Sequence, residues 1–138
     1  MSRILVAVSS PWAAEKNAET IADMARRLGA EVLVVHVSRP SGGQLREQEQ
    51  ADGEAAIRFL SDQLQQRSIP VQELLMFSDD IARAIVNTAN EREVTLIVLG
   101  LTGKSVFARL LAGNVPVELL KNSRVPVLIL PPDWTKSI

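Results

Sequence analysis

The stretch from Thr95 to Pro131, TLIVLGLTGKSVFARLLAGNVPVELLKNSRVPVLILP, decides the fold. It opens with an apolar run at 96–99 that ends in Gly100, and it closes with a second apolar run from Val125 to Leu130. A loop and a short helical segment lie between the two runs. Uninterrupted runs of β-branched residues and leucine are typical of parallel strands that are buried on both faces. The stretch therefore predicts a strand, a loop, a helix and a second strand of an α/β sheet.

The loop of this unit has the composition of an anion-binding segment. Residues 101–114 contain Gly103, Gly113, Lys104 and Arg109, and they include no acidic side chain. Glycines let the backbone approach a ligand, and a helix that starts just beyond the loop offers free N–H groups and partial positive charge. Because open α/β sheets bind ligands at the carboxyl ends of their strands, we predict an anion cradle here. The alternatives are that the glycines only turn a long loop and that the two cations are solvated surface charges.

The rest of the chain alternates apolar runs with helical patterns. Further strands are predicted at 3–8, 31–37 and 71–77, and helices at 14–28, at 57–67 and from 81 to about 89. Gly29 is the expected C-cap of the first helix, and Asp79 and Asp80 are read as an N-cap and a first-turn acid rather than as a catalytic pair. The third strand has a mixed pattern, which places it at a sheet edge. The polar segment 39–53 contains three glycines and is expected to be a mobile connection that runs into the next helix.

This order of elements predicts one α/β domain over residues 1–138, with a doubly wound parallel sheet of five strands and right-handed crossovers. The pattern alone does not order the strands.

Composition and charge narrow the classes of function. The chain has 138 residues and a net charge of −1, so no overall field favours nucleic acid or acidic lipid. It has no cysteine, which excludes thiolate chemistry, and its first apolar run is too short for a signal peptide or a membrane span. We expect a cytoplasmic protein that neither binds nucleic acid nor inserts into a membrane.

Several chemical motifs fail on spacing or on missing partners. Gly103-Lys104-Ser105 resembles the end of a P-loop, but the glycine required five residues earlier is Val98. The single histidine, His36, has no second histidine or cysteine nearby, so we expect a structural role and no metal site. Trp12 is expected to be a partly exposed cap on the loop after the first strand, with stacking on an adenine as the alternative. No nucleophile, base and orienting group converge, so we expect a binding module without catalytic residues.

The spacing of Gly100, Gly103 and Gly113 resembles the nucleotide-binding pattern of the universal stress protein family. The resemblance runs from ILVAV at 4–8, through VLVVHV at 32–37, to VPVLILP at 125–131. It implies an adenine-nucleotide alpha-hydrolase-like fold with strand order 3-2-1-4-5. In that order the switch point lies between the first and fourth strands, which places Ser9 beside Gly100.

The family pattern also implies which residues meet the ligand. The nucleoside would contact Ser9, Val37 and Leu99, and the phosphates would contact Gly100, Gly103, Gly113, Asn114 and Val115. The basic composition of the loop adds Lys104 and Arg109 as candidate phosphate contacts. Two of these positions depart from the family: Ser9 stands where an aspartate is usual, and Asn114 where serine or threonine is usual. Pro116 also removes one backbone N–H near the start of the following helix.

Three functional readings follow from the resemblance. The first is a signalling or stress-response protein that binds an adenine nucleotide, ATP or AMP, with Mg²⁺ accompanying ATP. The second is a family member that has lost nucleotide binding and acts as a dimeric interaction module for an unknown protein partner. The third is a slow ATP hydrolase. In all three, the resemblance implies a homodimer formed through the last strand, Val125–Leu130.

Overall fold

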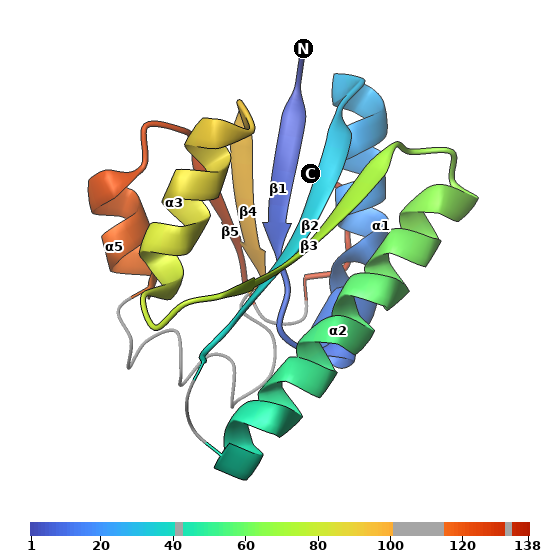
Figure 1. Ribbon diagram of the computed structural model, residues 1–138. Helices are drawn as coiled ribbons and strands as arrows, with labels where there is room; N and C mark the ends of the chain where they lie inside the picture. The colour runs from blue at the N-terminus through green and yellow to red at the C-terminus, as the bar shows by residue number, and fades with distance from the viewer. Residues whose placement is uncertain (41–42, 101–114, 132–133) are drawn as a thin grey trace.

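The computed structural model describes residues 1–40, 43–100, 115–131 and 134–138. The elements in chain order are β1 (Arg3–Ala7), α1 (Pro11–Leu28), β2 (Glu31–Ser38), α2 (Gly43–Gln66), β3 (Val71–Phe77), α3 (Ile81–Glu91), β4 (Leu96–Gly100), α5 (Val115–Asn122) and β5 (Val127–Leu130). The strands form one parallel sheet in the order β3-β2-β1-β4-β5. Helices α1 and α2 cover one face, and α3 and α5 cover the other (Figure 1). The predicted strand order and the edge position of β3 are confirmed.

Strand β1 lies at the centre of the sheet because its side chains are apolar on both faces. Leu5 is opposite Leu33 of β2 and Ile97 of β4 in the register of the two neighbouring strands. Successive residues of a strand point to opposite faces, so Leu5 enters the core under α3 and α5 while Ile4 and Val6 enter the core under α1 and α2. The sheet is therefore buried on both sides at its centre.

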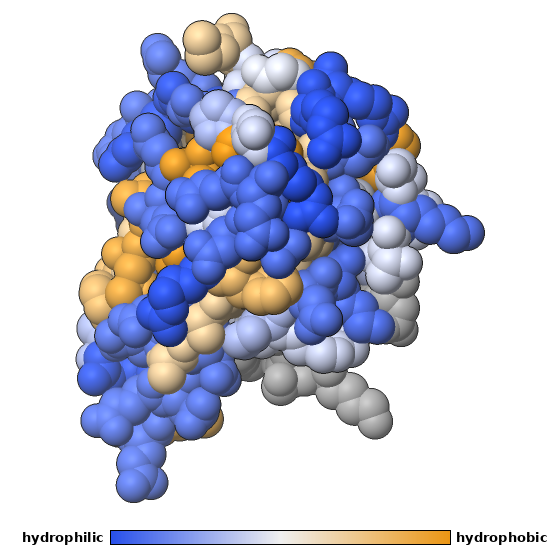
Figure 2. Space-filling view, turned by 90° about the vertical axis from the view of Figure 1, so that its right-hand side faces the viewer, coloured by the Kyte–Doolittle hydropathy of each residue, from blue (hydrophilic) through white to orange (hydrophobic). Residues whose placement is uncertain are grey.

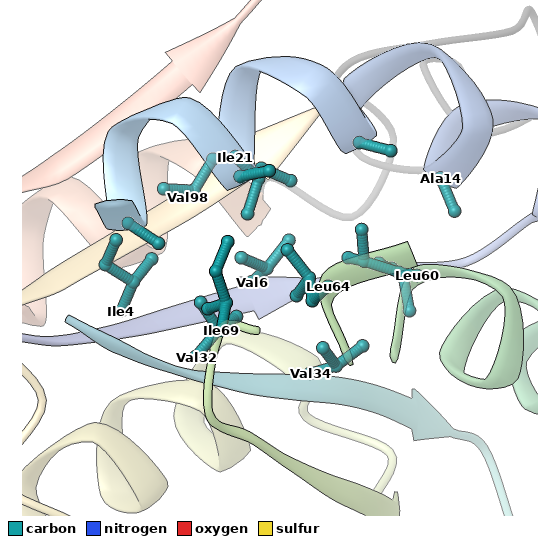
Figure 3. Close-up of a cluster of buried hydrophobic side chains, with 14 of the residues drawn as sticks. Ile4, Val6, Ala14, Ile21, Val32, Val34, Leu60, Leu64, Ile69 and Val98 are labelled. Carbon is teal, nitrogen blue, oxygen red and sulfur yellow. The ribbon is translucent and has the colours of Figure 1, made fainter. Parts of the chain in front are cut away.

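The core between the sheet and α1 and α2 is shown in Figure 3. Ile21 of α1 and Leu60 and Leu64 of α2 lie over Val6 and Val98, and all five side chains are almost fully buried. Burial of an aliphatic side chain of this size stabilises the fold by about 1.5–3 kcal/mol. The same contacts hold α1 and α2 against this face of the sheet.

Helix α1 starts earlier than the apolar spacing indicates. The Ser10 side chain accepts a hydrogen bond from the backbone N–H of Ala13 at 3.2 Å, and Pro11 occupies the first helical position. Trp12 therefore lies in the first turn of α1, 47% exposed, with Lys16 Nζ 4.8 Å from its ring centroid. Trp12 is partly exposed as expected, but its expected place on a loop is wrong because α1 starts before it.

Helix α2 also starts earlier than expected, at Gly43. Residues 43–53 are helical, so the prediction of a mobile connection over 39–53 is wrong. Glutamine, glutamate, arginine and leucine are good helix formers, and they dominate this segment. Side chains four residues apart support the helix, since Gln48 donates to Asp52 at 2.9 Å and Gln50 donates to Glu54 at 3.1 Å. These local interactions outweigh the glycines that suggested a loop.

The end of α1 is as predicted, since Gly29 lies there in the left-handed region, at φ 62°. At the start of α3 the predicted acidic cap is present, with the Asp80 carboxylate accepting a hydrogen bond from the backbone N–H of Arg83 at 3.1 Å. Asp80 is the N-cap itself, and the expected first-turn acid is absent because Asp79 and Asp80 both precede the helix.

The outer surface over α1 and α2 is mostly hydrophilic. Figure 2 looks onto this side of the molecule and shows polar residues interrupted by small apolar areas. Within the described ranges, no helix combines the length and the apolar character needed to cross a membrane.

Candidate functional site: a crevice at the carboxyl ends of the central strands

A crevice of about 690 Å³ lies where the strand order reverses between β1 and β4. The ends of β1, β2 and β4 form its floor, and α2, α3 and α5 contribute its walls. Its volume is within the range of about 300–1,000 Å³ that is usual for small-molecule sites. Doubly wound sheets bind their ligands at this location, because the crossovers on either side of the reversal leave a gap above the strand ends.

Five of the ten predicted site residues line the crevice together. They are Ser9, Val37, Leu99, Gly100 and Val115. The prediction that Ser9 and Gly100 lie at one crevice is confirmed by this lining. The other five positions, Gly103, Lys104, Arg109, Gly113 and Asn114, lie outside the described residues.

One wall of the crevice is apolar. Val37 and Leu99 belong to the buried cluster on the α3/α5 side, and they are joined there by Ile85 of α3 and Val115 of α5. A flat aromatic base can lose water against such a surface without leaving a protein polar group unpaired.

The charged lining of the crevice is mostly acidic and was not predicted from the sequence. Its carboxylates are Glu49 of α2, Asp79 and Asp80 before α3, and Glu118 of α5. The described lining contains one arginine, Arg39, whose Nη2 lies 2.7 Å from Glu49 Oε1. The sequence did contain a signal for part of this set, since Asp79 and Asp80 come two and three residues after the end of a predicted strand.

His36 is buried at the end of β2 and also lines the crevice. Its Nδ1 lies 2.7 Å from the carbonyl oxygen of Val8. A carbonyl oxygen can only accept, so Nδ1 carries the proton and donates it. This bond joins the ends of β1 and β2 and holds the ring in place, which agrees with the structural role expected for His36.

Gly53 of α2 is explained by the ring of His36. A Cβ at position 53 would lie 2.1 Å from the ring carbon Cδ2, far inside van der Waals contact. The glycine that suggested a loop in the sequence therefore lets a helix pass close to a buried imidazole.

Gly100 has a similar reason that does not involve a ligand. A Cβ at this position would lie 2.0 Å from Nδ2 of Asn17, which is buried in α1. The close approach of α1 to the end of β4 thus requires a residue without a side chain. Sequence reasoning missed Asn17, because a single asparagine in a helical pattern gives no sign of what it faces across the fold.

Among the described residues, no group of three or more histidine, cysteine, aspartate or glutamate side chains could hold a metal ion.

The sequence comparisons and the structure comparisons point to the same protein family. The sequence model of the universal stress protein family matches residues 1–131. A universal stress protein from Methanocaldococcus jannaschii is 41% identical over 49 residues, a match that covers 36% of this chain and 29% of that relative. The chain therefore spans less than a third of that curated relative.

Solved structures share the fold over nearly the whole chain. The universal stress protein from Archaeoglobus fulgidus in complex with dAMP has a TM-score of 0.70 and 23% identity, covering 94% of this chain and 97% of that one. A universal stress protein family protein from Arabidopsis thaliana with AMP bound has a TM-score of 0.64 and 16% identity, covering 96% and 92%.

Proposed function

Because this chain belongs to the universal stress protein family, we propose that its crevice binds an adenine nucleotide. The observation that carries the proposal is the crevice itself, which has an apolar wall at Val37 and Leu99 and a polar floor at Ser9. Structures of the same fold contain dAMP, cAMP and AMP, which supports this class of ligand. The role is one of binding, with signalling or a stress response as its outcome.

In this proposal the base lies against Val37 and Leu99, with Ser9 beside the nucleoside. The phosphates lie toward Gly100 and Val115 and continue onto the segment 101–114, which follows β4 in the sequence. That segment supplies the glycines, the asparagine and the two cations already named from the sequence.

The acidic lining favours ligands that carry few phosphates. Four carboxylates and one arginine line the described part of the crevice, and the arginine is paired with Glu49. Each added phosphate brings negative charge toward these carboxylates, and Lys104 and Arg109 can balance only part of it. We therefore propose that AMP or a similar mononucleotide binds with higher affinity than ATP, and that ATP would bind together with Mg²⁺.

Calorimetry with adenosine, AMP and ATP tests the proposal, with Mg²⁺ both present and absent. We expect AMP to bind more tightly than ATP without Mg²⁺. Asp79→Asn should raise ATP affinity roughly threefold, the effect of one partly screened charge, and should change adenosine affinity little.

Glu91→Gln, at the far end of α3, is the matched control and should change neither affinity. If none of the three ligands binds at millimolar concentration, the proposal fails and the reading as a dimeric interaction module replaces it. Phosphate release from ATP during the same titration would instead support the hydrolase reading.

We also propose that the chain forms a homodimer through β5. This strand lies at the sheet edge, and its residues Val127, Leu128 and Ile129 are only partly buried. An apolar strand edge of this kind favours pairing with another chain, and a second copy pairs symmetrically about a two-fold axis.

A proline at position 129 tests this interface. The backbone N–H of Ile97 donates to the carbonyl of Pro126, so by alternation the polar groups of residues 127 and 129 point away from β4. Ile129→Pro should therefore leave the pairing with β4 in place while it removes an outward donor, which raises the dimer dissociation constant about tenfold or more.

Glu73→Pro makes the same change at the opposite sheet edge and should leave the dimer intact. Sedimentation that gives a monomer mass for the unchanged protein at micromolar concentration would contradict the dimer.

A further inference from the structure

Asn17 is a buried polar side chain whose position the crevice alone does not explain. It lies in α1, 4% exposed, and its amide nitrogen occupies the space that a side chain at position 100 would fill. Its helical neighbours on the same side, Ala14, Ala18 and Ile21, are apolar members of the core. An alanine at position 17 would continue this pattern without a polar atom in the core.

The oxygen of the Asn17 amide has no hydrogen-bond partner within the part of the chain that the structure describes. A buried acceptor without a donor lowers stability, so such atoms usually meet a water molecule or a ligand. A water molecule or a ligand that reaches this oxygen would therefore supply the donor that the described residues do not.

A second, small cavity lies beside Asn17. It measures about 10 Å³ and has room for about one water molecule. Among its lining residues, only Ser9 and Asn17 have polar side chains. Ser9 and Gly100 line the large crevice as well, so the two cavities are neighbours across these residues.

We propose that Asn17 is a specificity-determining residue that acts through one water molecule in this small cavity. The water donates one hydrogen bond to Asn17 Oδ1 and bonds to the hydroxyl of Ser9. Its remaining position faces the crevice and takes a hydroxyl group of the ligand's ribose. This inference rests on the proposed binding of an adenine nucleotide.

The pair of Ser9 and Asn17 gives the floor of the crevice a neutral polar group. A serine alone offers one hydroxyl, whereas the water bridge adds a second group that can donate or accept a hydrogen bond. Such a subsite can distinguish a ribose from a deoxyribose without adding negative charge to a crevice that already has four carboxylates.

The first test compares affinity with stability in Asn17→Ala. The proposal predicts that adenosine binds about fivefold more weakly or worse, the usual effect of one lost hydrogen bond, while the melting temperature of the free protein stays the same or rises. A side chain that serves packing alone would give the opposite pair of results, a lower melting temperature with unchanged affinity. That outcome would overturn the proposal.

Ser61→Ala provides the matched control. Ser61 is a buried residue of the neighbouring helix α2, its hydroxyl also has no partner among the described residues, and it lines neither cavity. Its removal should leave adenosine affinity unchanged.

Two further measurements identify the water and the ligand group. The unchanged protein should prefer adenosine to 2′-deoxyadenosine or to 3′-deoxyadenosine, and Asn17→Ala should lose that preference. The double variant with Ser9→Ala and Asn17→Ala should lose less binding free energy for adenosine than the sum of the two single losses. The reason is that both substitutions disturb the same water. Strictly additive losses would contradict the shared water.

A crystal structure of the free protein separates this inference from the proposed function. An ordered water within hydrogen-bond distance of Asn17 Oδ1 supports the small cavity as a water site even if no adenine nucleotide binds. An empty cavity in a well-ordered structure overturns the inference, whatever the ligand measurements show.

Discussion

The two faces of the sheet are built differently around the same crevice. On the α3/α5 side, aliphatic side chains of the strands and helices fill the space, and Thr88 is the one buried polar residue described there. The other six buried polar residues of the described chain lie on the α1/α2 side: Asn17, Thr20, His36, Ser38, Glu49 and Ser61. Two glycines, Gly53 and Gly100, make room for His36 and Asn17 on that side.

The two sides of the sheet therefore hold the crevice in position by different kinds of contact. An aliphatic face fills space, and its stability depends on volume. A polar face depends on particular pairs of residues, because each buried polar atom needs a partner and each close approach needs a small residue opposite it. On the α3/α5 side we therefore expect the change in stability to follow the side-chain volume that a substitution removes. On the α1/α2 side we expect it to depend on which residue the substituted side chain faces.

The largest effect is expected on the aliphatic face. Leu119 of α5 is fully buried, so Leu119→Ala should lower the free energy of unfolding by about 2–5 kcal/mol. The next residue, Leu120, is mostly exposed, and Leu120→Ala should cost less than about 0.5 kcal/mol. Denaturation in urea measures both values. A similar loss at the two positions would show that this face is not organised by burial.

An intermediate effect is expected where α2 crosses His36. Alanine is the better helix former by about 1 kcal/mol, yet Gly53→Ala should destabilise the protein by about 1–3 kcal/mol, since the new Cβ meets the imidazole. In a His36→Ala background the ring is absent, so the same substitution should become stabilising. If the sign does not reverse between the two backgrounds, the contact between Gly53 and His36 does not control this crossing.

The smallest effect is expected for a buried hydroxyl on the polar face. Ser61 has no hydrogen-bond partner among the described residues, so Ser61→Ala should raise the free energy of unfolding, by up to about 1 kcal/mol. The reverse change at buried Ala56 of the same helix, Ala56→Ser, should lower it. Thermal melting of the two variants checks the opposite signs. A loss of stability in Ser61→Ala would mean that the hydroxyl has a partner after all.

The sequence predicted the elements whose evidence is local. The apolar runs identified all five strands, and helix caps such as Gly29 and Asp80 were found because capping depends on a few adjacent residues. The strand order came from the family resemblance, since periodicity says which face a residue occupies but not which strand lies beside it.

The prediction was wrong or silent where contacts join distant parts of the chain. Gly53 signalled a loop in the sequence, and only the nearness of His36 explains a glycine inside α2. Asn17 and Glu49 gave no signal for the same reason, because their neighbours belong to other elements. The family resemblance placed Ser9, Val37 and Leu99 at the crevice, whereas Glu49 and Glu118 of its acidic lining had no signal in the sequence.

The cap on α3 has a consequence for the direction of a bound ligand. The first turn of a helix attracts negative charge, but at α3 the carboxylate of Asp80 already occupies the backbone N–H of Arg83. At α1 the corresponding cap is the neutral hydroxyl of Ser10. The starts of α1 and α3 are thus electrically unequal, and the carboxylate of Asp80, which lines the crevice, repels the anionic end of an elongated ligand. The carboxylate that stabilises the first turn of α3 therefore also makes the two ends of the crevice electrostatically different.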